Sequence, residues 1–160
     1  MSARSVPLSN LSPEDRAEIL RVGPIWGKDI GKHREITVDI YGRMLEKQPT
    51  AGIAVTKDIA YGADPRQVLD VFTPTGAKNA DVMIFVHGGA FVRGDKSQPG
   101  GIYDNFLYWF GHQGMVGVNV EYRLGDKAPY PGGGEDVREA VAWVRANIAK
   151  HGGNLGRIFL

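Results

Sequence analysis

The sequence predicts an α/β fold in which an antiparallel hairpin is followed by parallel strands joined by crossover helices. Three observations support this prediction. Residues 53–72 alternate with a period of two around a Gly-Ala-Asp-Pro turn at 62–65, as the strands of a hairpin do. Residues 82–86 and 115–120 are near-continuous apolar runs, which is typical of strands covered on both faces. Segments of helical periodicity separate and follow these runs, which favours right-handed crossovers and a mostly parallel sheet.

Two helices are expected before the hairpin. Ser12 lies in front of Pro13 and two acidic residues, an arrangement that opens a helix, and this helix should run toward Arg21. Residues 33–47 place apolar side chains four positions apart, which predicts a second helix that ends before Pro49.

Two more helices are expected after the hairpin. Apolar residues at helical spacing predict one helix between the two apolar runs, ended by Gly111 and Gly114. They predict another over residues 137–148, which stops at Gly152 and leads into a short strand at 158–160. Each apolar run is thus followed by a helix that can cover the sheet.

The composition indicates one soluble globular domain, because 42% hydrophobic residues in a chain of 160 suffice for a core. A net charge of +1 gives no electrostatic argument for binding nucleic acid or an anionic membrane. The absence of cysteine excludes disulfides, thiolate metal sites and cysteine nucleophiles. The N-terminus has no continuous apolar segment that would indicate a signal peptide or a membrane helix. We therefore expect a cytoplasmic protein.

An apolar strand runs directly into His87-Gly88-Gly89-Ala90, and this stretch is the strongest functional signal in the chain. An oxyanion hole needs main-chain amides aimed at one point close to the substrate, which small residues allow. Taken alone, the two glycines are equally compatible with a tight strand-to-helix turn that has a histidine at its mouth.

The apolar strand and its His-Gly-Gly loop resemble the loop after the third strand of α/β-hydrolase esterases and lipases. Glu121-Tyr122-Arg123-Leu124, followed by Ala128-Pro129-Tyr130-Pro131 and Glu135-Asp136, looks like a segment of hormone-sensitive-lipase-like esterases. The resemblance covers about residues 53–160, and the first two helices match the cap elements of that branch less specifically. It implies cap-like helices in residues 1–50 and the first half of an α/β-hydrolase core in residues 51–160.

The resemblance also implies roles for the loop residues. The amides of Gly89 and Ala90 would face the oxyanion, and Ala90 replaces the third glycine of the commoner His-Gly-Gly-Gly form. His87 would anchor the loop by hydrogen bonding, since the general base of this family comes late in the chain. We assign substrate-binding positions to the residues around the two amides: His87, Gly88, Phe91 and Val92.

The carboxylates of the 121–136 segment and the serines of the chain are not expected to belong to a catalytic triad. Without the resemblance, Glu121 and Arg123 would be an ordinary ion pair or solvated charges, and Asp136 a carboxylate at a helix start. We assign them support of the oxyanion loop and of the crossover helix. Ser97 lacks a Gly-x-Ser-x-Gly context and is interpreted as a loop residue or helix cap.

The triad is therefore expected outside this chain. Residues 154–160 look like the strand that leads into the Gly-x-Ser-x-Gly nucleophile turn of the family. In the fold of that family this strand is central. Without a further strand beside it, residues 158–160 would form an apolar sheet edge with unpaired backbone groups. We expect a second polypeptide segment to complete the sheet, and the isolated chain to be inactive.

Other sites are not supported by the sequence. Gly132-Gly133-Gly134 precedes the predicted helix, but Val137 occupies the place where the last glycine of a dinucleotide fingerprint would fall. The histidines outside the loop, His33, His112 and His151, show no metal-ligand spacing. We expect neither a metal nor a cofactor.

The resemblance implies a serine carboxylesterase that acts on small or medium acyl esters through an acyl-enzyme, with this chain supplying the oxyanion hole. Two alternatives remain at this point. One is an amidase such as a kynurenine-formamidase-like enzyme, which shares the His-Gly-Gly loop. The other is a non-catalytic binding protein derived from a hydrolase.

Overall fold

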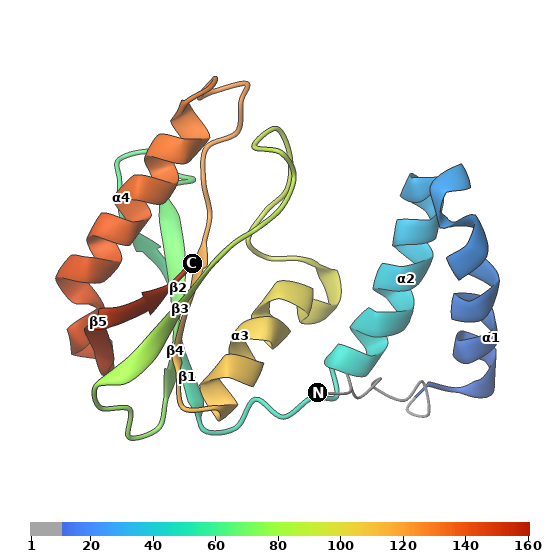
Figure 1. Ribbon diagram of the computed structural model, residues 1–160, viewed down its shortest axis with the longest axis horizontal. Helices are drawn as coiled ribbons and strands as arrows, with labels where there is room; N and C mark the ends of the chain where they lie inside the picture. Colours follow the sequence, from blue (N-terminus) through green and yellow to red (C-terminus); the bar gives the residue numbers. More distant parts are fainter. Residues whose placement is uncertain (1–10) are drawn as a thin grey trace.

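The computed structural model describes residues 11–160 and contains one five-stranded sheet in the order β1-β2-β4-β3-β5 (Figure 1). Strand β2 pairs antiparallel with both β1 and β4, whereas β3 pairs parallel with β4 and β5. The predicted arrangement, a hairpin followed by parallel strands, is confirmed. The strands are β1 (Ile53–Ala60), β2 (Val68–Pro74), β3 (Ala80–Val86), β4 (Val116–Val120) and β5 (Gly153–Phe159).

Helices cover both faces of this sheet (Figure 1), with α3 (Ile102–His112) on one side and α4 (Gly132–Asn147) on the other. Alternate residues of β4 point to opposite faces. Val118 joins the cluster that α4 covers with Ala140 and Val144, whereas Gly117 lies against Leu107 of α3. The turn η4 (Ile148–His151) follows α4 directly and leads into β5.

Two boundaries in the second half of the chain differ from the sequence prediction. The glycines at 132–134 form the first turn of α4 instead of preceding the helix, because the Glu135 amide donates to the Pro131 carbonyl at 3.1 Å. Strand β5 begins at Gly153, five residues earlier than expected. Its first part pairs with Ala80 and, after a register shift, Ile158 and Phe159 pair with Val82 and Met83.

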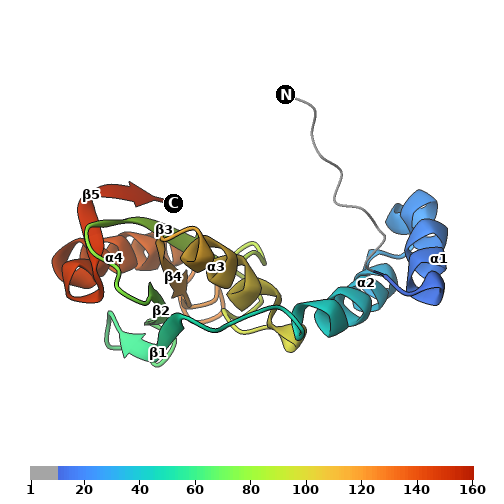
Figure 2. The same ribbon diagram turned by 90° about the horizontal axis from the view of Figure 1, so that it is seen from below.

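The N-terminal helices form an arm that projects away from the sheet (Figure 2). The arm consists of α1 (Pro13–Val22), the turn η2 (Gly23–Lys28) and α2 (Ile30–Leu45). Helix α1 starts as predicted, since the Ser12 side chain accepts from the Asp15 amide at 3.0 Å. Helix α2 starts three residues earlier than predicted, because Asp29 caps it by accepting from the Lys32 amide at 3.1 Å.

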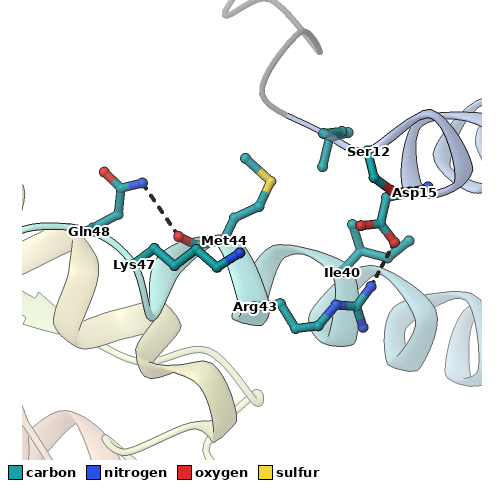
Figure 3. A pocket seen from close by; sticks show the side chains of 8 residues that line it. Ser12, Asp15, Ile40, Arg43, Met44, Lys47 and Gln48 are labelled. Carbon is teal, nitrogen blue, oxygen red and sulfur yellow. Dashed lines mark hydrogen bonds and ion pairs between the residues drawn. The ribbon is translucent and has the colours of Figure 1, made fainter.

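The arm joins the core through the C-terminal end of α2. Gly42 lies against Gly100 of the turn η3 (Pro99–Gly101), and Asn105 donates to the Leu45 carbonyl at 3.2 Å. Within the arm, a cavity of about 250 Å³ lies between α1 and α2. Figure 3 shows Arg43 reaching across this region to Asp15, a contact of 2.6 Å.

Candidate functional site

The loop after β3 has an unusual backbone. Gly89, Ala90 and Phe91 all have positive φ angles, of 133°, 55° and 59°. A side chain at Gly89 is excluded, since its Cβ would come within 1.8 Å of the Arg93 carbonyl oxygen. Positive φ in alanine and phenylalanine costs of order 1–3 kcal/mol per residue, so the surrounding structure has to hold this conformation.

The amides of Gly89 and Ala90 are available in this conformation. Within residues 11–160, neither donates a hydrogen bond to a backbone or side-chain acceptor. The Gly89 carbonyl, in contrast, accepts from the amides of Val92 and Arg93 at 3.0 and 3.2 Å, which closes the turn. The turn thus closes through the Gly89 carbonyl, while the Gly89 and Ala90 amides, like those of Gly88 and Phe91, have no acceptor among residues 11–160.

His87 anchors the start of the loop. Its side chain is completely buried; Nε2 lies 2.9 Å from Glu121 Oε1 and Nδ1 lies 2.8 Å from the Gly88 carbonyl. The imidazole also stacks on the Tyr122 ring at 4.2 Å, and the Tyr122 hydroxyl donates to the His87 carbonyl at 2.8 Å. Both ring nitrogens have partners and one face of the ring is stacked on Tyr122. The side chain therefore holds the start of the loop in place from the protein interior.

Glu121 connects His87 to the far end of the loop. Besides His87, its carboxylate accepts from Arg66 Nη2 at 2.5 Å and from the amides of Lys96 and Tyr122 at 2.8 and 3.1 Å. Burial alone would raise the pKa of Glu121, but the hydrogen bonds from His87 and the two amides, together with the Arg66 charge, lower it below its ordinary value. The carboxylate therefore stays ionised and can hold four donors.

Arg66 reaches this carboxylate from the turn between β1 and β2. Its guanidinium donates to the carbonyls of Gly94 and Tyr122, both at 2.8 Å, and to Asp95 at 3.0 Å. The sequence analysis missed Arg66 because an arginine in a hairpin turn looks like any solvated charge. Its contacts are made 28 to 56 positions away along the chain.

A second buried ion pair fixes the segment after Gly94. Lys96 Nζ lies 2.8 Å from both Asp70 and Asp58, and Asn119 donates to the Lys96 carbonyl at 2.9 Å. Burial alone would lower the pKa of Lys96, yet hydrogen bonds and charges from the two carboxylates raise it. The sequence analysis did not select this pair, although an aspartate inside the apolar strand β2 is the signal that could have indicated it.

Arg123 pairs with Asp136 and not with Glu121, so the expectation of an ordinary Glu121–Arg123 pair is wrong. The Arg123 amide and guanidinium both donate to Asp136, at 2.8 and 2.6 Å, because the chain after β4 runs past the start of α4. Gln67 adds a hydrogen bond at 2.9 Å. Burial opposes ionisation of Asp136, but the Arg123 hydrogen bonds outweigh it and lower the pKa. This pair ties α4 to the sheet.

The four expected substrate positions divide into two groups. The ring of His87 is buried, whereas Gly88, Phe91 and Val92 are exposed, Val92 to 66%. A cavity of about 380 Å³ adjoins the far end of the loop and is lined in part by Lys96, Ser97 and Glu121. Neither Gly89 nor Ala90 lines it.

Residues 11–160 contain no cluster of three or more side chains that could hold a metal ion. Ser12 caps α1 and Ser97 lies in the exposed segment before η3, while Ser2, Ser5 and Ser9 lie outside the described residues. In the same part of the chain, every helix is too short or too polar to cross a membrane.

Comparison with known sequences finds one family model and relatives that are named as esterases or carboxylesterases. The sequence model of the BD-FAE family matches residues 69–160. Esterase LipC of Mycobacterium tuberculosis is 40% identical over 100 residues, which are 60% of this chain and 24% of that protein. Probable carboxylesterase 1 of Arabidopsis thaliana is 30% identical over 111 residues, 65% of this chain and 34% of that protein. The chain thus spans about a third or less of these two relatives.

Solved structures show the same likeness in fold. A bacterial heroin esterase has a TM-score of 0.63 at 24% identity, covering 94% of this chain and 48% of that one. Esterase B from Lactobacillus rhamnosis has a TM-score of 0.60 at 18% identity, covering 92% of this chain and 44% of that one. The described residues therefore correspond in fold to just under half of each of these esterases.

Proposed function

Because the chain belongs to the BD-FAE family of α/β-hydrolases, we propose that it supplies the oxyanion hole of a serine-type carboxylic ester hydrolase. The observation that supports this proposal best is the pair of unused amides at Gly89 and Ala90, directly after β3. Backbone N–H groups fixed in this way stabilise the negative charge that develops on a carbonyl oxygen during acyl transfer.

In the proposed reaction, a serine hydroxyl from outside residues 1–160 attacks the ester carbonyl carbon while a histidine takes its proton. The carbonyl oxygen becomes negative and accepts from the Gly89 and Ala90 amides. Collapse of the tetrahedral intermediate expels the alcohol and leaves an acyl-serine, which water then hydrolyses. The part of this chain in the mechanism is to hold the two donors before the charge appears.

The buried network explains why the donors stay in place. Glu121 binds His87 at one end of the loop and the Lys96 amide at the other, so a single carboxylate clamps both ends. Donors that are already oriented need no reorganisation during the reaction, which is the main source of their catalytic effect. Removing one such donor from a hydrolase typically costs about 100- to 1,000-fold in turnover.

We propose small or medium acyl esters as substrates, since the relatives include proteins named esterase and carboxylesterase. Phe91 and Val92 are exposed beside the two amides and would form one wall of the acyl pocket. The helices of residues 1–50 would act as a cap-like element next to the core. The sheet would be completed beyond β5 by a further polypeptide segment.

The test uses the full-length protein that contains this chain, assayed with 4-nitrophenyl acetate and butyrate and labelled with a fluorophosphonate probe. We expect ester turnover, and labelling of one serine that peptide mapping places outside residues 1–160. Faster turnover of aryl amides or N-formyl amides than of the matched esters would assign the protein to the amidases instead. Absence of both labelling and turnover would overturn the proposal in favour of a binding protein.

A further inference from the structure

The three glycines at the start of α4 are not equivalent. A Cβ built on Gly133 would lie 2.3 Å from the Phe91 ring carbon Cδ1, and 2.7 and 2.9 Å from the next two ring carbons. A Cβ on Gly134 would have no heavy atom within 4 Å. The Phe91 ring therefore occupies the space that a side chain at position 133 would need.

Phe91 is one of the strained residues of the oxyanion loop. Its φ of 59° follows the φ of 55° at Ala90, and two successive non-glycine residues in the left-handed region require external support. Its ring packs on Tyr122 with centroids 4.8 Å apart, and Tyr122 stacks on His87. Its carbonyl accepts from the Gly125 amide at 2.7 Å. The ring thus links the loop to the start of α4 and to the His87 stack.

Glycine in a helix is unfavourable relative to alanine, so three of them in the first turn weaken α4 unless they have a role. At position 132 a Cβ would lie 2.6 Å from the Ala128 Cβ, so the packing of Ala128 accounts for Gly132. For Gly133, the three atoms nearest to the position of a Cβ are all carbons of the Phe91 ring.

We propose that Gly133 is a positioning residue: it provides the seat for the Phe91 ring and thereby holds Ala90 and Phe91 in the conformation that presents the oxyanion amides. A methyl group at position 133 would expel the ring, and the backbone of residues 89–91 would lose a main lateral support. The proposal rests on the proposed function for its effect on turnover, but not for its effect on loop structure.

The experiment compares Gly133→Ala with Gly134→Ala in the full-length protein. Both variants add one methyl group to the same helical turn, and only the first meets Phe91. Two quantities are measured: hydrogen exchange of the Val92 and Arg93 amides, whose bonds to the Gly89 carbonyl close the turn, and kcat and KM for 4-nitrophenyl butyrate. We expect the Val92 and Arg93 amides of Gly133→Ala to exchange roughly tenfold faster. We expect kcat to fall roughly 10- to 100-fold, at most as much as on loss of a whole oxyanion donor, and KM to change less than kcat. Gly134→Ala should match the wild type in both.

Phe91→Leu and the double variant Gly133→Ala/Phe91→Leu keep the test decisive if Gly133→Ala does not fold. Once the ring is replaced by leucine, adding the methyl group should change loop exchange less than twofold. Equal loop exchange and equal kcat in Gly133→Ala and Gly134→Ala would overturn the proposal that Gly133 positions the Phe91 ring. Faster loop exchange in Gly133→Ala alone, in a protein that hydrolyses no ester, would support the seat and reject the proposed function.

Discussion

Ion pairs occur both in the N-terminal arm and around the His87–Phe91 loop, but their burial differs between the two regions. In the arm, Arg21 pairs with Glu18 three positions away, and the two side chains are 53% and 35% exposed. Around the loop, the Glu121 and Asp70 side chains are 8% and 0% exposed, and their partners come from distant parts of the chain. The same residue types thus form exposed pairs on a helix in one region and hold the loop after β3 in place in the other.

The physical difference is the cost of leaving a partner unpaired. An exposed pair exchanges one set of water contacts for another, so its loss changes little. A buried carboxylate that loses its cation, or the reverse, retains an uncompensated charge in a medium that solvates it poorly. The loop is therefore sensitive to single substitutions in a way that the arm is not.

The largest effect is expected for Glu121→Ala. The substitution removes four hydrogen bonds at once, so that Arg66 loses its buried carboxylate partner and the buried His87 ring loses the partner of Nε2. We expect the free energy of unfolding, measured by urea denaturation, to fall by about 3–5 kcal/mol. Glu18→Ala in the arm is the matched control and should leave the urea midpoint unchanged. Equal midpoints for the two variants would contradict the distinction between the regions.

A smaller loss is expected for Lys96→Met, which leaves Asp70 buried without its cation. We expect about 3 kcal/mol of destabilisation by urea denaturation. The double variant Lys96→Met/Asp70→Leu removes both charges and should recover part of this loss, because an apolar pair carries no desolvation penalty but the Asp58 amide loses its bond to Asp70. If the double variant is as unstable as the sum of its single substitutions, Asp70 has another role.

The periodic elements could be predicted from the sequence, whereas the long-range polar contacts could not. The hairpin, β3, β4 and their helices follow from local apolar spacing, which reports burial directly. The partners of Glu121 do not, because Arg66 lies 55 positions away in a turn and nothing local distinguishes it from a solvated arginine. The two glycines after β3 are a local signal of an unusual backbone, and the φ of 133° at Gly89 agrees with it, whereas the oxyanion role of the Gly89 and Ala90 amides stays a prediction.

The Gly132-Gly133-Gly134 stretch shows where a local rule gives the wrong boundary. Glycine is a poor helix former, so the sequence favours a helix that begins after it. The structure begins α4 at Gly132, where the first turn has to pass close to Ala128 and to the Phe91 ring. Packing against another segment decided the boundary, and one sequence does not contain that information.

The two regions should also differ in their response to acid. Glu121 and Asp136 have lowered pKa values in the folded protein despite burial, because of the hydrogen bonds and cations around them. Their contribution is present above the unfolded pKa values, near 4.5 and 3.8, and is lost as the pH falls through the lower folded values. Asp104, whose pKa burial raises, acts in the opposite direction and offsets part of this loss.

The free energy of unfolding of the wild type should therefore decrease from about pH 6 to about pH 3. Glu121→Gln should show a shallower decrease, because it cannot lose that charge, and urea titrations at several pH values measure the slope. Glu18→Gln is the control from the arm, and its slope should follow the wild type at moderate salt, since exposed charges are screened. A slope that is the same for Glu121→Gln and the wild type would contradict the assignment.

The smallest effect concerns the joint between the two regions. Gly100 has a φ of 71°, and a Cβ there would lie 2.4 Å from the Gly42 Cα. Gly101 has a similar φ of 62°, yet its Cβ would meet nothing within 4 Å. Alanine at either position carries the same backbone penalty, of about 1 kcal/mol, but only Gly100→Ala pushes α2 away from η3.

We expect Gly100→Ala to loosen the arm while the sheet stays folded. The exposed segment 46–52 between α2 and β1 should then be cleaved several times faster by trypsin at low concentration, because Lys47 lies within it. Gly101→Ala should be cleaved at nearly the rate of the wild type, and both variants should keep the same circular dichroism. Equal cleavage rates for the two variants would mean that the Asn105 hydrogen bond to Leu45, and not the glycine contact, holds the arm to the core.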